Sequence, residues 1–262
     1  MDPAESKAFS SYRSRYVALS IKEVLAALPM QSSDRLLDVC CGSGELTKAL
    51  ADQLQTGRVT AIDINPQMVE IAESANTSPN ITFAVADAGN ADTFLSTWKN
   101  SYDKVLCYYS LYLIKDWEAV TLKGIYECLK PGGIAFLNTL AASTHVFQIG
   151  KDGLHFPKWK QYFEDYEYPM HGVTKDYFKE ALEKVGFKIK SFQFSVRSLD
   201  ADNDQTARNI FRPFTSQSNC VPAEKREQYR EEFFQYFKKQ SKDTDDGTMR
   251  WELEVITVVV EK

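Results

Sequence analysis

Hydrophobic and polar positions alternate along the first half of the chain as short apolar runs separated by longer amphipathic segments. The apolar runs predict strands at 35–39, 58–63, 81–87, 102–109 and 134–140. Between them, apolar residues recur every third or fourth position, which predicts helices at 45–54, 66–75, 92–99 and 117–129. Strands that alternate with helices in this way are typical of βαβ units. We therefore predict an α/β fold with a parallel sheet and helices on both faces.

After the fifth predicted strand this regular order breaks. Residues 141–172 are rich in aromatics and read as loop, and residues 199–250 form a polar insertion. The insertion contains a charged helix over 223–240, in which Tyr229, Phe233 and Phe237 form one apolar stripe. A helix at 173–185 and two strands at 187–196 and 251–260 complete the pattern. We expect one domain over 1–262, with 141–172 and 199–250 as helical or aromatic cap insertions that contact the substrate.

The first predicted helix covers residues 5–28 and is unusually aromatic. Tyr12 and Tyr16 are four positions apart and share one of its faces. Two interpretations stay open for this helix. It either packs on the domain or forms a lid over a bound ligand.

Composition narrows the class of protein. The chain has 262 residues and a net charge of −5, without a block of basic residues, so nucleic acid is not expected as a partner. No apolar run reaches membrane-spanning length and the N-terminus lacks the apolar core of a signal peptide, so we expect a cytoplasmic protein with no membrane partner. The five cysteines lack C-x-x-C spacing, which favours free thiols over disulfides or a metal site.

The stretch Leu36–Thr47, L-L-D-V-C-C-G-S-G-E-L-T, carries the strongest chemical signal. A strand ends in Asp38, a loop of small residues follows, and a helix begins. The dinucleotide pattern G-x-G-x-x-G fails here, because a third glycine would fall on Thr47. The shorter pattern of an acidic residue followed by G-x-G is met by Asp38, Gly42 and Gly44. Asp63 and Asp87 end the next two strands, although an aspartate after a strand is often only a helix cap.

With these aspartates, the glycine loop and the turn Pro131-Gly132-Gly133, the sequence resembles the class I S-adenosylmethionine-dependent methyltransferases. The resemblance implies a Rossmann-like, seven-stranded, mainly parallel sheet with an antiparallel last strand. It also implies that Asp63 holds the ribose hydroxyls, that Asp87 binds the adenine amino group, and that the loop contacts the amino-acid end of S-adenosyl-L-methionine. The cofactor-binding residues it implies are Asp38, Cys40, Gly42, Ser43, Gly44, Asp63, Ile64, Met68, Asp87, Ala88 and Cys107. Cys40 departs from the glycine that many members carry there.

A narrower resemblance lies outside the common core. The segments S-K-A-F-S at 6–10, Y-S-L-Y-L-I-K-D-W at 109–117 and R-P-F at 212–214 are similar to the arthropod juvenile hormone acid (farnesoic acid) methyltransferases. Bacterial trans-aconitate methyltransferases are more distantly similar, and both groups make methyl esters of carboxylic acids. The sequence departs from the arthropod pattern at 111–113, where L-H-W is usual, and at Tyr16, where a glutamine is common. The resemblance implies a small apolar carboxylic acid as acceptor in juvenile hormone biosynthesis.

Methylation of a carboxylate requires little catalytic chemistry from the protein. The pKa of a carboxylic acid, about 4 to 5, leaves it ionised at neutral pH, so no general base is required and the protein has to orient the reactants and exclude water. As catalytic, orienting residues we name Tyr16, Tyr112 and Trp159, and as substrate contacts Tyr12, Trp117, His145 and Tyr162. An amine, phenol or carbon acceptor stays open, as does a catalytically silent cofactor-binding subunit. A homodimer is also left open.

Overall fold

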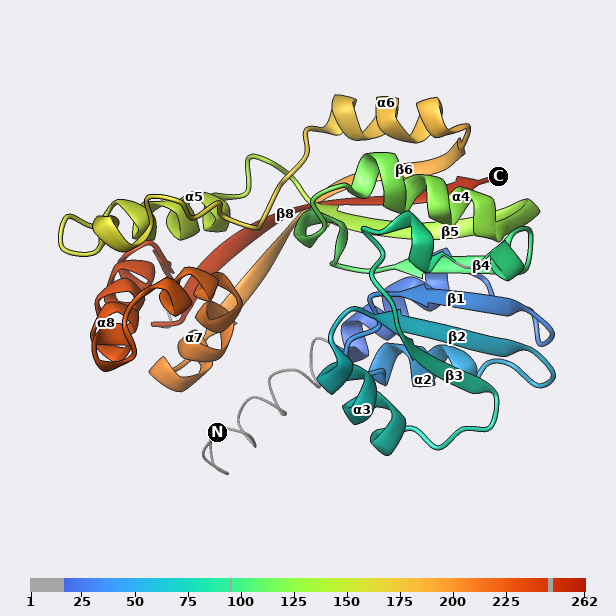
Figure 1. Ribbon diagram of the computed structural model, residues 1–262, viewed down its shortest axis with the longest axis horizontal. Helices are drawn as coiled ribbons and strands as arrows, with labels where there is room; N and C mark the ends of the chain where they lie inside the picture. Colours follow the sequence, from blue (N-terminus) through green and yellow to red (C-terminus); the bar gives the residue numbers. More distant parts are fainter. Residues whose placement is uncertain (1–16, 95, 245–246) are drawn as a thin grey trace.

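The computed structural model describes residues 17–94, 96–244 and 247–262 (Figure 1). Within them the strands form one sheet of order β3-β2-β1-β4-β5-β8-β6, with a short β7 paired to β8. The strands are β1 Arg35–Val39, β2 Arg58–Asp63, β3 Ile81–Val85, β4 Tyr102–Cys107, β5 Leu129–Leu140, β6 Lys188–Ala201, β7 Lys242–Asp243 and β8 Met249–Glu261. Neighbouring strands from β3 to β5 are parallel, whereas β8 is antiparallel to both β5 and β6. The predicted Rossmann-like sheet with seven strands and an antiparallel last strand is confirmed, with the two-residue β7 as an addition.

Helices cover both faces of this sheet (Figure 1). The described helices are the segment 17–27, α2 Glu45–Ala51, α3 Pro66–Ala75, α4 Lys123–Cys128, α5 His145–Asp152, α6 Lys175–Val185, α7 Asp204–Phe211 and α8 Ala223–Lys239. Of these, α5, α7 and α8 lie beside the far ends of β6 and β8, away from the other strands (Figure 1). Alternate residues of β1 point to opposite faces. Leu36 belongs to an apolar cluster with Val24 of the first helical segment, and Leu37 to a cluster with Phe178 of α6. Because β1 is buried on both faces, its sequence is almost continuously apolar.

A third apolar cluster lies where β6 and β8 extend past the other strands of the sheet and pack against α7 and α8 (Figure 1). We call residues 145–172 and 204–239 the cap. The stripe Tyr229, Phe233 and Phe237 of α8 is completely buried in this cluster. The ring of Phe237 stacks on Trp251 of β8 with 4.3 Å between centroids. The cap is therefore anchored through aromatic packing on the same strands that complete the sheet.

The structure corrects three expectations about local structure. Residues 141–172 are not all loop, because His145–Asp152 forms α5 and buries Val146, Phe147 and Ile149. The helix expected at 92–99 is reduced to two short 3₁₀ turns, Ala91–Thr93 and Ser96–Trp98. There, the side chain of Asn90 accepts the Asp92 N–H, and such local side-chain bonds compete with helix formation. The helix expected at 117–129 begins instead with a π-helical turn, Trp117–Leu122.

The first predicted helix is only partly described. Residues 17–27 are helical, while Tyr12, Tyr16 and the question of a lid lie outside the described residues. Among the described helices, none combines the length and the apolarity that crossing a bilayer requires.

Candidate active site

The order of the sheet reverses between β1 and β4, and ligands of open α/β sheets bind at such a point beside the carboxyl ends of the strands. The loop 40–44 follows β1 at this place. Cys40, Gly42 and Gly44 all have positive φ, at 64°, 58° and 80°. A Cβ on Gly44 would lie only 2.9 Å from Asn76 Nδ2 and 3.0 Å from Ala72 Cβ. Glycine is thus required at position 44 both by the backbone conformation and by the close approach of α3.

Asp38 connects the two elements on either side of this loop. Its carboxylate is buried, and Oδ2 accepts a 2.6 Å hydrogen bond from Thr47 Oγ1 of α2. Burial raises the pKa of Asp38 to about 6, which the Thr47 bond partly opposes and the charge of Asp63 increases. Asp38 therefore joins the end of β1 to the first turns of α2.

Asp63 and Asp87 occupy corresponding places at the ends of β2 and β3. Asp63 Oδ2 accepts the Gly42 N–H at 2.9 Å and Oδ1 accepts the Asn65 N–H at 2.9 Å. Asp87 Oδ1 accepts the Gly89 N–H at 2.8 Å. A carboxylate oxygen has capacity for more than one donor, so both side chains are held in place and can still accept hydrogen bonds from a ligand.

Both carboxylates line a cavity of about 400 Å³ at this edge of the sheet. Its walls are Cys40, Asp63, Ile64, Asp87, Ala88, Gly89, Ser110, Leu113, Ile114, Lys115 and Asp116. Ile64 and Leu113 expose 60% and 49% of their surface and give this cavity apolar walls. The volume is in the range of small-molecule sites. Two anchored carboxylates beside apolar side chains suit a ligand with a ribose and a flat base.

Five of the predicted cofactor residues line this cavity: Cys40, Asp63, Ile64, Asp87 and Ala88. The other six, Asp38, Gly42, Ser43, Gly44, Met68 and Cys107, do not line it. Cys107 is completely buried in β4, where a hydrogen bond with Cys40 and burial raise its pKa well above the ordinary value. Within the described residues the five cysteines are free, and no three His, Cys, Asp or Glu side chains are grouped to hold a metal.

The residues after β4 form a polar cluster that sequence reasoning missed. Tyr109 has a φ of 52°, and its N–H donates to Asn138 Oδ1 of β5 at 3.2 Å. The guanidinium of Arg197 in β6 lies over the Tyr109 ring, 5.6 Å from its centroid. Arg197 also pairs with Glu23, which accepts a 2.7 Å bond from Tyr108 OH. No spacing signal reveals this cluster, because its members lie far apart in the sequence.

The tyrosines on this side of the site are kept protonated. Burial raises the pKa of Tyr109 to about 12, and burial also raises the pKa values of Tyr108 and Tyr112. Tyr112 packs on Phe147 of α5 with 5.8 Å between ring centroids, and its carbonyl oxygen accepts the His171 N–H at 2.8 Å. These phenols are therefore protonated at neutral pH, and the O–H of Tyr108 is donated to Glu23.

The remaining predicted acceptor residues are dispersed. Trp159 is 1% exposed in the interior of the cap, and its Nε1–H donates to Glu232 at 2.6 Å. Tyr162 packs beside it and accepts a bond from Lys225 Nζ at 3.1 Å. Trp117 packs edge-on against Phe178 of α6 in the core, and His145 is exposed at the start of α5. Packing in the cap and in the core accounts for the burial of the two tryptophans, and their pocket roles stay predictions.

Comparison with known proteins identifies the family. A family profile described as a methyltransferase domain matches residues 9–191. The chain belongs to the class I S-adenosylmethionine-dependent methyltransferases. S-adenosyl-L-methionine is accordingly its cofactor. The profile ends before α7 and α8, so those elements of this methyltransferase lie outside the shared domain.

Its relatives include demethylmenaquinone methyltransferases of bacteria. The protein from Lactobacillus johnsonii is 30% identical over 179 residues, covering 64% of this chain and 73% of the relative. That from Staphylococcus haemolyticus is 32% identical over 195 residues, covering 68% and 80%. The solved structure of YcgJ from Bacillus subtilis has the same fold, with a TM-score of 0.60 and 16% identity over 94% of this methyltransferase and 97% of that chain.

Proposed function

We propose that this methyltransferase forms the methyl ester of a small apolar carboxylic acid bound between the cofactor cavity and the cap. The observation that carries the proposal is the guanidinium of Arg197 over the ring of Tyr109, just after β4. Tyr109 and Tyr112 are protonated at neutral pH and can donate a hydrogen bond, whereas the Tyr108 O–H is already donated to Glu23. A carboxylate acceptor is already ionised there and needs donors, whereas an amine or phenol acceptor would have to lose a proton to a base.

In this proposal some residues bind the cofactor and others orient the acceptor. Asp63 and Asp87 would hold the ribose and the adenine, and the 40–44 loop the amino-acid end. When bound, S-adenosyl-L-methionine supplies an activated methyl group on a sulfonium, an excellent leaving group. Tyr109 and Tyr112 would donate to one acceptor oxygen, so that the other is aligned with the carbon–sulfur bond. A new oxygen–methyl bond forms as that bond breaks, and no proton is released. Such orientation contributes roughly 7–11 kcal/mol of barrier lowering.

Arg197 and the aromatic walls suit an acid with an apolar body. Arg197 pairs with Glu23, but a guanidinium has five N–H donors, and those left over suit an anionic head group near Tyr109. Tyr112, which packs on the buried Phe147, would offer apolar surface to an alkyl or terpenoid chain. A juvenile hormone acid or farnesoic acid is the narrower form of the proposal. It rests on the resemblance at 109–117 and 212–214, and the bacterial relatives do not support it.

A second candidate acceptor is a ring carbon of a lipophilic quinone. The names of the bacterial relatives favour it, since those proteins are demethylmenaquinone methyltransferases. Carbon methylation would require a base to activate the ring. His171 is half-buried and its backbone is bonded to Tyr112, so it is the base we would assign. Both candidates share a small apolar acceptor.

The deciding experiment incubates the protein with radiolabelled S-adenosyl-L-methionine and each acceptor in turn, followed by mass identification of the product. The acceptors are farnesoic acid, fatty acids of several lengths, aconitate and demethylmenaquinone. A labelled methyl ester from an acid supports the first proposal. Labelled menaquinone without any ester would overturn it in favour of the second.

The pH profile separates the same two mechanisms. A carboxylate acceptor predicts a rate that is flat from about pH 6 to about pH 9, while an acceptor that needs a base predicts a rising limb. His171→Gln should leave the flat profile unchanged. A large loss of kcat in this variant, with cofactor affinity retained, would instead identify His171 as the base.

A further inference from the structure

A second cavity lies in the cap, away from the cofactor cavity. It has a volume of about 610 Å³ and shares no lining residue with the cavity at the ends of β2 and β3. Its walls come from α7, from the turn 215–219 and from the first half of α8. The lining residues are Gln205, Arg208, Asn209, Phe211, Arg212, Thr215, Ser216, Ser218, Asn219, Glu227 and Arg230.

Charge distinguishes this cavity from the rest of the molecule. Three arginines and one glutamate line it, in a chain whose net charge is −5. Arg208 and Arg212 are four positions apart and lie on the same face of the chain at the end of α7. Arg230 reaches the cavity from α8. A local excess of positive charge on an acidic protein attracts small anions.

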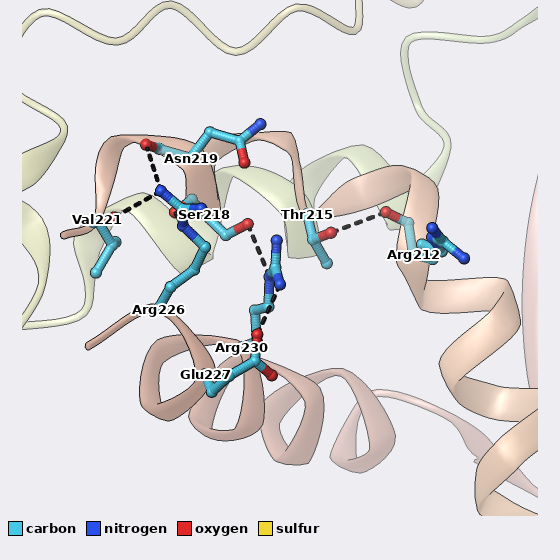
Figure 2. A network of polar contacts seen from close by, with 8 residues as sticks. All are labelled: Arg212, Thr215, Ser218, Asn219, Val221, Arg226, Glu227 and Arg230. Atoms are coloured by element: carbon cyan, nitrogen blue, oxygen red, sulfur yellow. Dashed lines mark hydrogen bonds and ion pairs between the residues drawn. The ribbon is translucent and has the colours of Figure 1, made fainter. Parts of the chain in front are cut away.

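Two of these guanidinium groups, those of Arg208 and Arg230, are held in fixed directions. Arg208 donates to Glu231 at 2.7 Å and lies over the Phe234 ring at 3.8 Å. Arg230 Nε donates to Ser218 Oγ at 3.1 Å and Nη1 to Glu227 at 2.7 Å (Figure 2). A guanidinium has five N–H donors, so these contacts use only part of its capacity. The remaining donors are available to a ligand without a large cost in side-chain entropy.

The turn 215–219, which forms one wall of the cavity, is held by polar contacts. Arg226 donates from Nε to Ser218 O at 3.2 Å and from Nη2 to Val221 O at 3.3 Å (Figure 2). Thr215 Oγ1 donates to Arg212 O at 2.8 Å (Figure 2). On its other side the turn contacts the segment 145–172 of the cap, through a 2.9 Å hydrogen bond between Tyr166 OH and Ser216 Oγ. The turn 215–219 therefore connects this cavity to the segment 145–172 of the cap.

We propose that this cavity binds a small soluble molecule that carries phosphate groups. Arginine forks match the oxygen geometry of phosphate in bidentate fashion, and hydroxyl and amide side chains supply further donors. The volume exceeds that of a single phosphate, so an organic phosphate or a diphosphate fits better than the bare ion. Binding would tie α7 to α8 and so stabilise the cap. The proposal is independent of the acceptor chemistry.

The test is isothermal titration of the intact protein with inorganic pyrophosphate, which lacks the adenosine that the cofactor cavity would recognise. We expect saturable binding with one site per chain that weakens as salt concentration rises. The double variant Arg208→Gln/Arg212→Gln should weaken it by at least about tenfold, because two charge-assisted contacts are lost. Arg58→Gln removes the same kind of charge at the exposed start of β2 and should have no effect.

Two measurements keep the test decisive. Circular dichroism and S-adenosyl-L-methionine affinity of the double variant should match the parent, which shows that the loss is local. The absence of saturable binding to the parent, or equal binding to the double variant, would overturn the proposal. Co-sedimentation with phosphatidylcholine vesicles containing phosphatidic acid tests a lipid source of the same phosphate chemistry. Binding to those vesicles without binding to pyrophosphate would overturn the assignment to a soluble ligand.

Discussion

Thr47 Oγ1 donates a 2.6 Å hydrogen bond to Asp38 Oδ2, and both side chains are buried beneath the 40–44 loop. The bond joins the carboxyl end of β1 to the first turn of α2. It also keeps a carboxylate in a place where water does not reach it. A buried charge of this kind costs stability, and its pKa of about 6 measures that cost.

The first prediction concerns the pH dependence of this pair. The folded-state pKa of Asp38 lies above its ordinary value of 3.8, so the folded state binds more protons than the unfolded state between these two values. Asp38 therefore lowers the stability of the parent as pH rises from about 4 to about 6. Asp38→Asn keeps an acceptor for Thr47 and removes the charge. Relative to the parent, it should gain up to ~3 kcal/mol in the free energy of unfolding.

This gain is measured by urea denaturation of both proteins at about pH 4 and at about pH 8. The difference in the free energy of unfolding between the two proteins should be small at about pH 4 and reach its full size at about pH 8. A difference that is independent of pH would contradict the raised pKa. Asp176→Asn, an exposed carboxylate in the first turn of α6, serves as the control for a general charge effect.

The second prediction separates backbone strain from steric clash in the glycine loop. Gly44 and Gly132 have nearly equal φ values of 80° and 77°, but a Cβ on Gly132 would meet nothing within 4 Å. Both alanine variants should lose ~1 kcal/mol of stability from the left-handed conformation. Gly44→Ala should lose a further ~1–3 kcal/mol, because its methyl group would displace Asn76 and Ala72. Equal unfolding free energies in the two variants would show that the loop accommodates the methyl group.

The third prediction tests the cofactor site through Asp63. Asp63→Ala removes the acceptor of the Gly42 and Asn65 N–H groups as well as the charge facing the cavity. We expect the affinity for S-adenosyl-L-methionine to fall by at least about tenfold, since charge-assisted hydrogen bonds are lost. Isothermal titration provides the measurement, and Asp176→Ala is the matched surface control. An unchanged dissociation constant would remove Asp63 from the cofactor site.

Much of the cofactor half of this protein could be predicted from the sequence, because its signals are local. The strand, loop and helix at 36–47 fix Asp38 and the glycines within a few residues, and Asp63 and Asp87 follow their strands directly. The parallel sheet follows from the alternation of periods 2 and 3.6. The cavity then brings together Asp63 and Asp87, which the sequence shows only as separate strand ends.

The proposed acceptor site around Arg197 and the cap could not be predicted, because its contacts are made by residues that are distant in the chain. Arg197 meets Tyr109 only because β6 lies beyond β8 at the edge of the sheet, a pairing that no short motif encodes. Aromatic content suggested a pocket around Trp159, yet most of these rings fill the cap interior instead. Aromatic residues are used for packing more often than for ligand contact, so composition alone does not distinguish the two.

The last prediction concerns Arg197, which we place beside the acceptor. Arg197→Gln should raise KM for an acid acceptor by at least about tenfold through loss of a charge-assisted contact, while the affinity for S-adenosyl-L-methionine stays the same. Because this variant also leaves Glu23 without its partner, Arg197→Lys is measured in parallel and should recover part of the loss. Arg250→Gln breaks a comparable ion pair with Asp200 on the neighbouring strand and controls for stability. An unchanged KM for every acid in Arg197→Gln would show that the guanidinium only supports the fold.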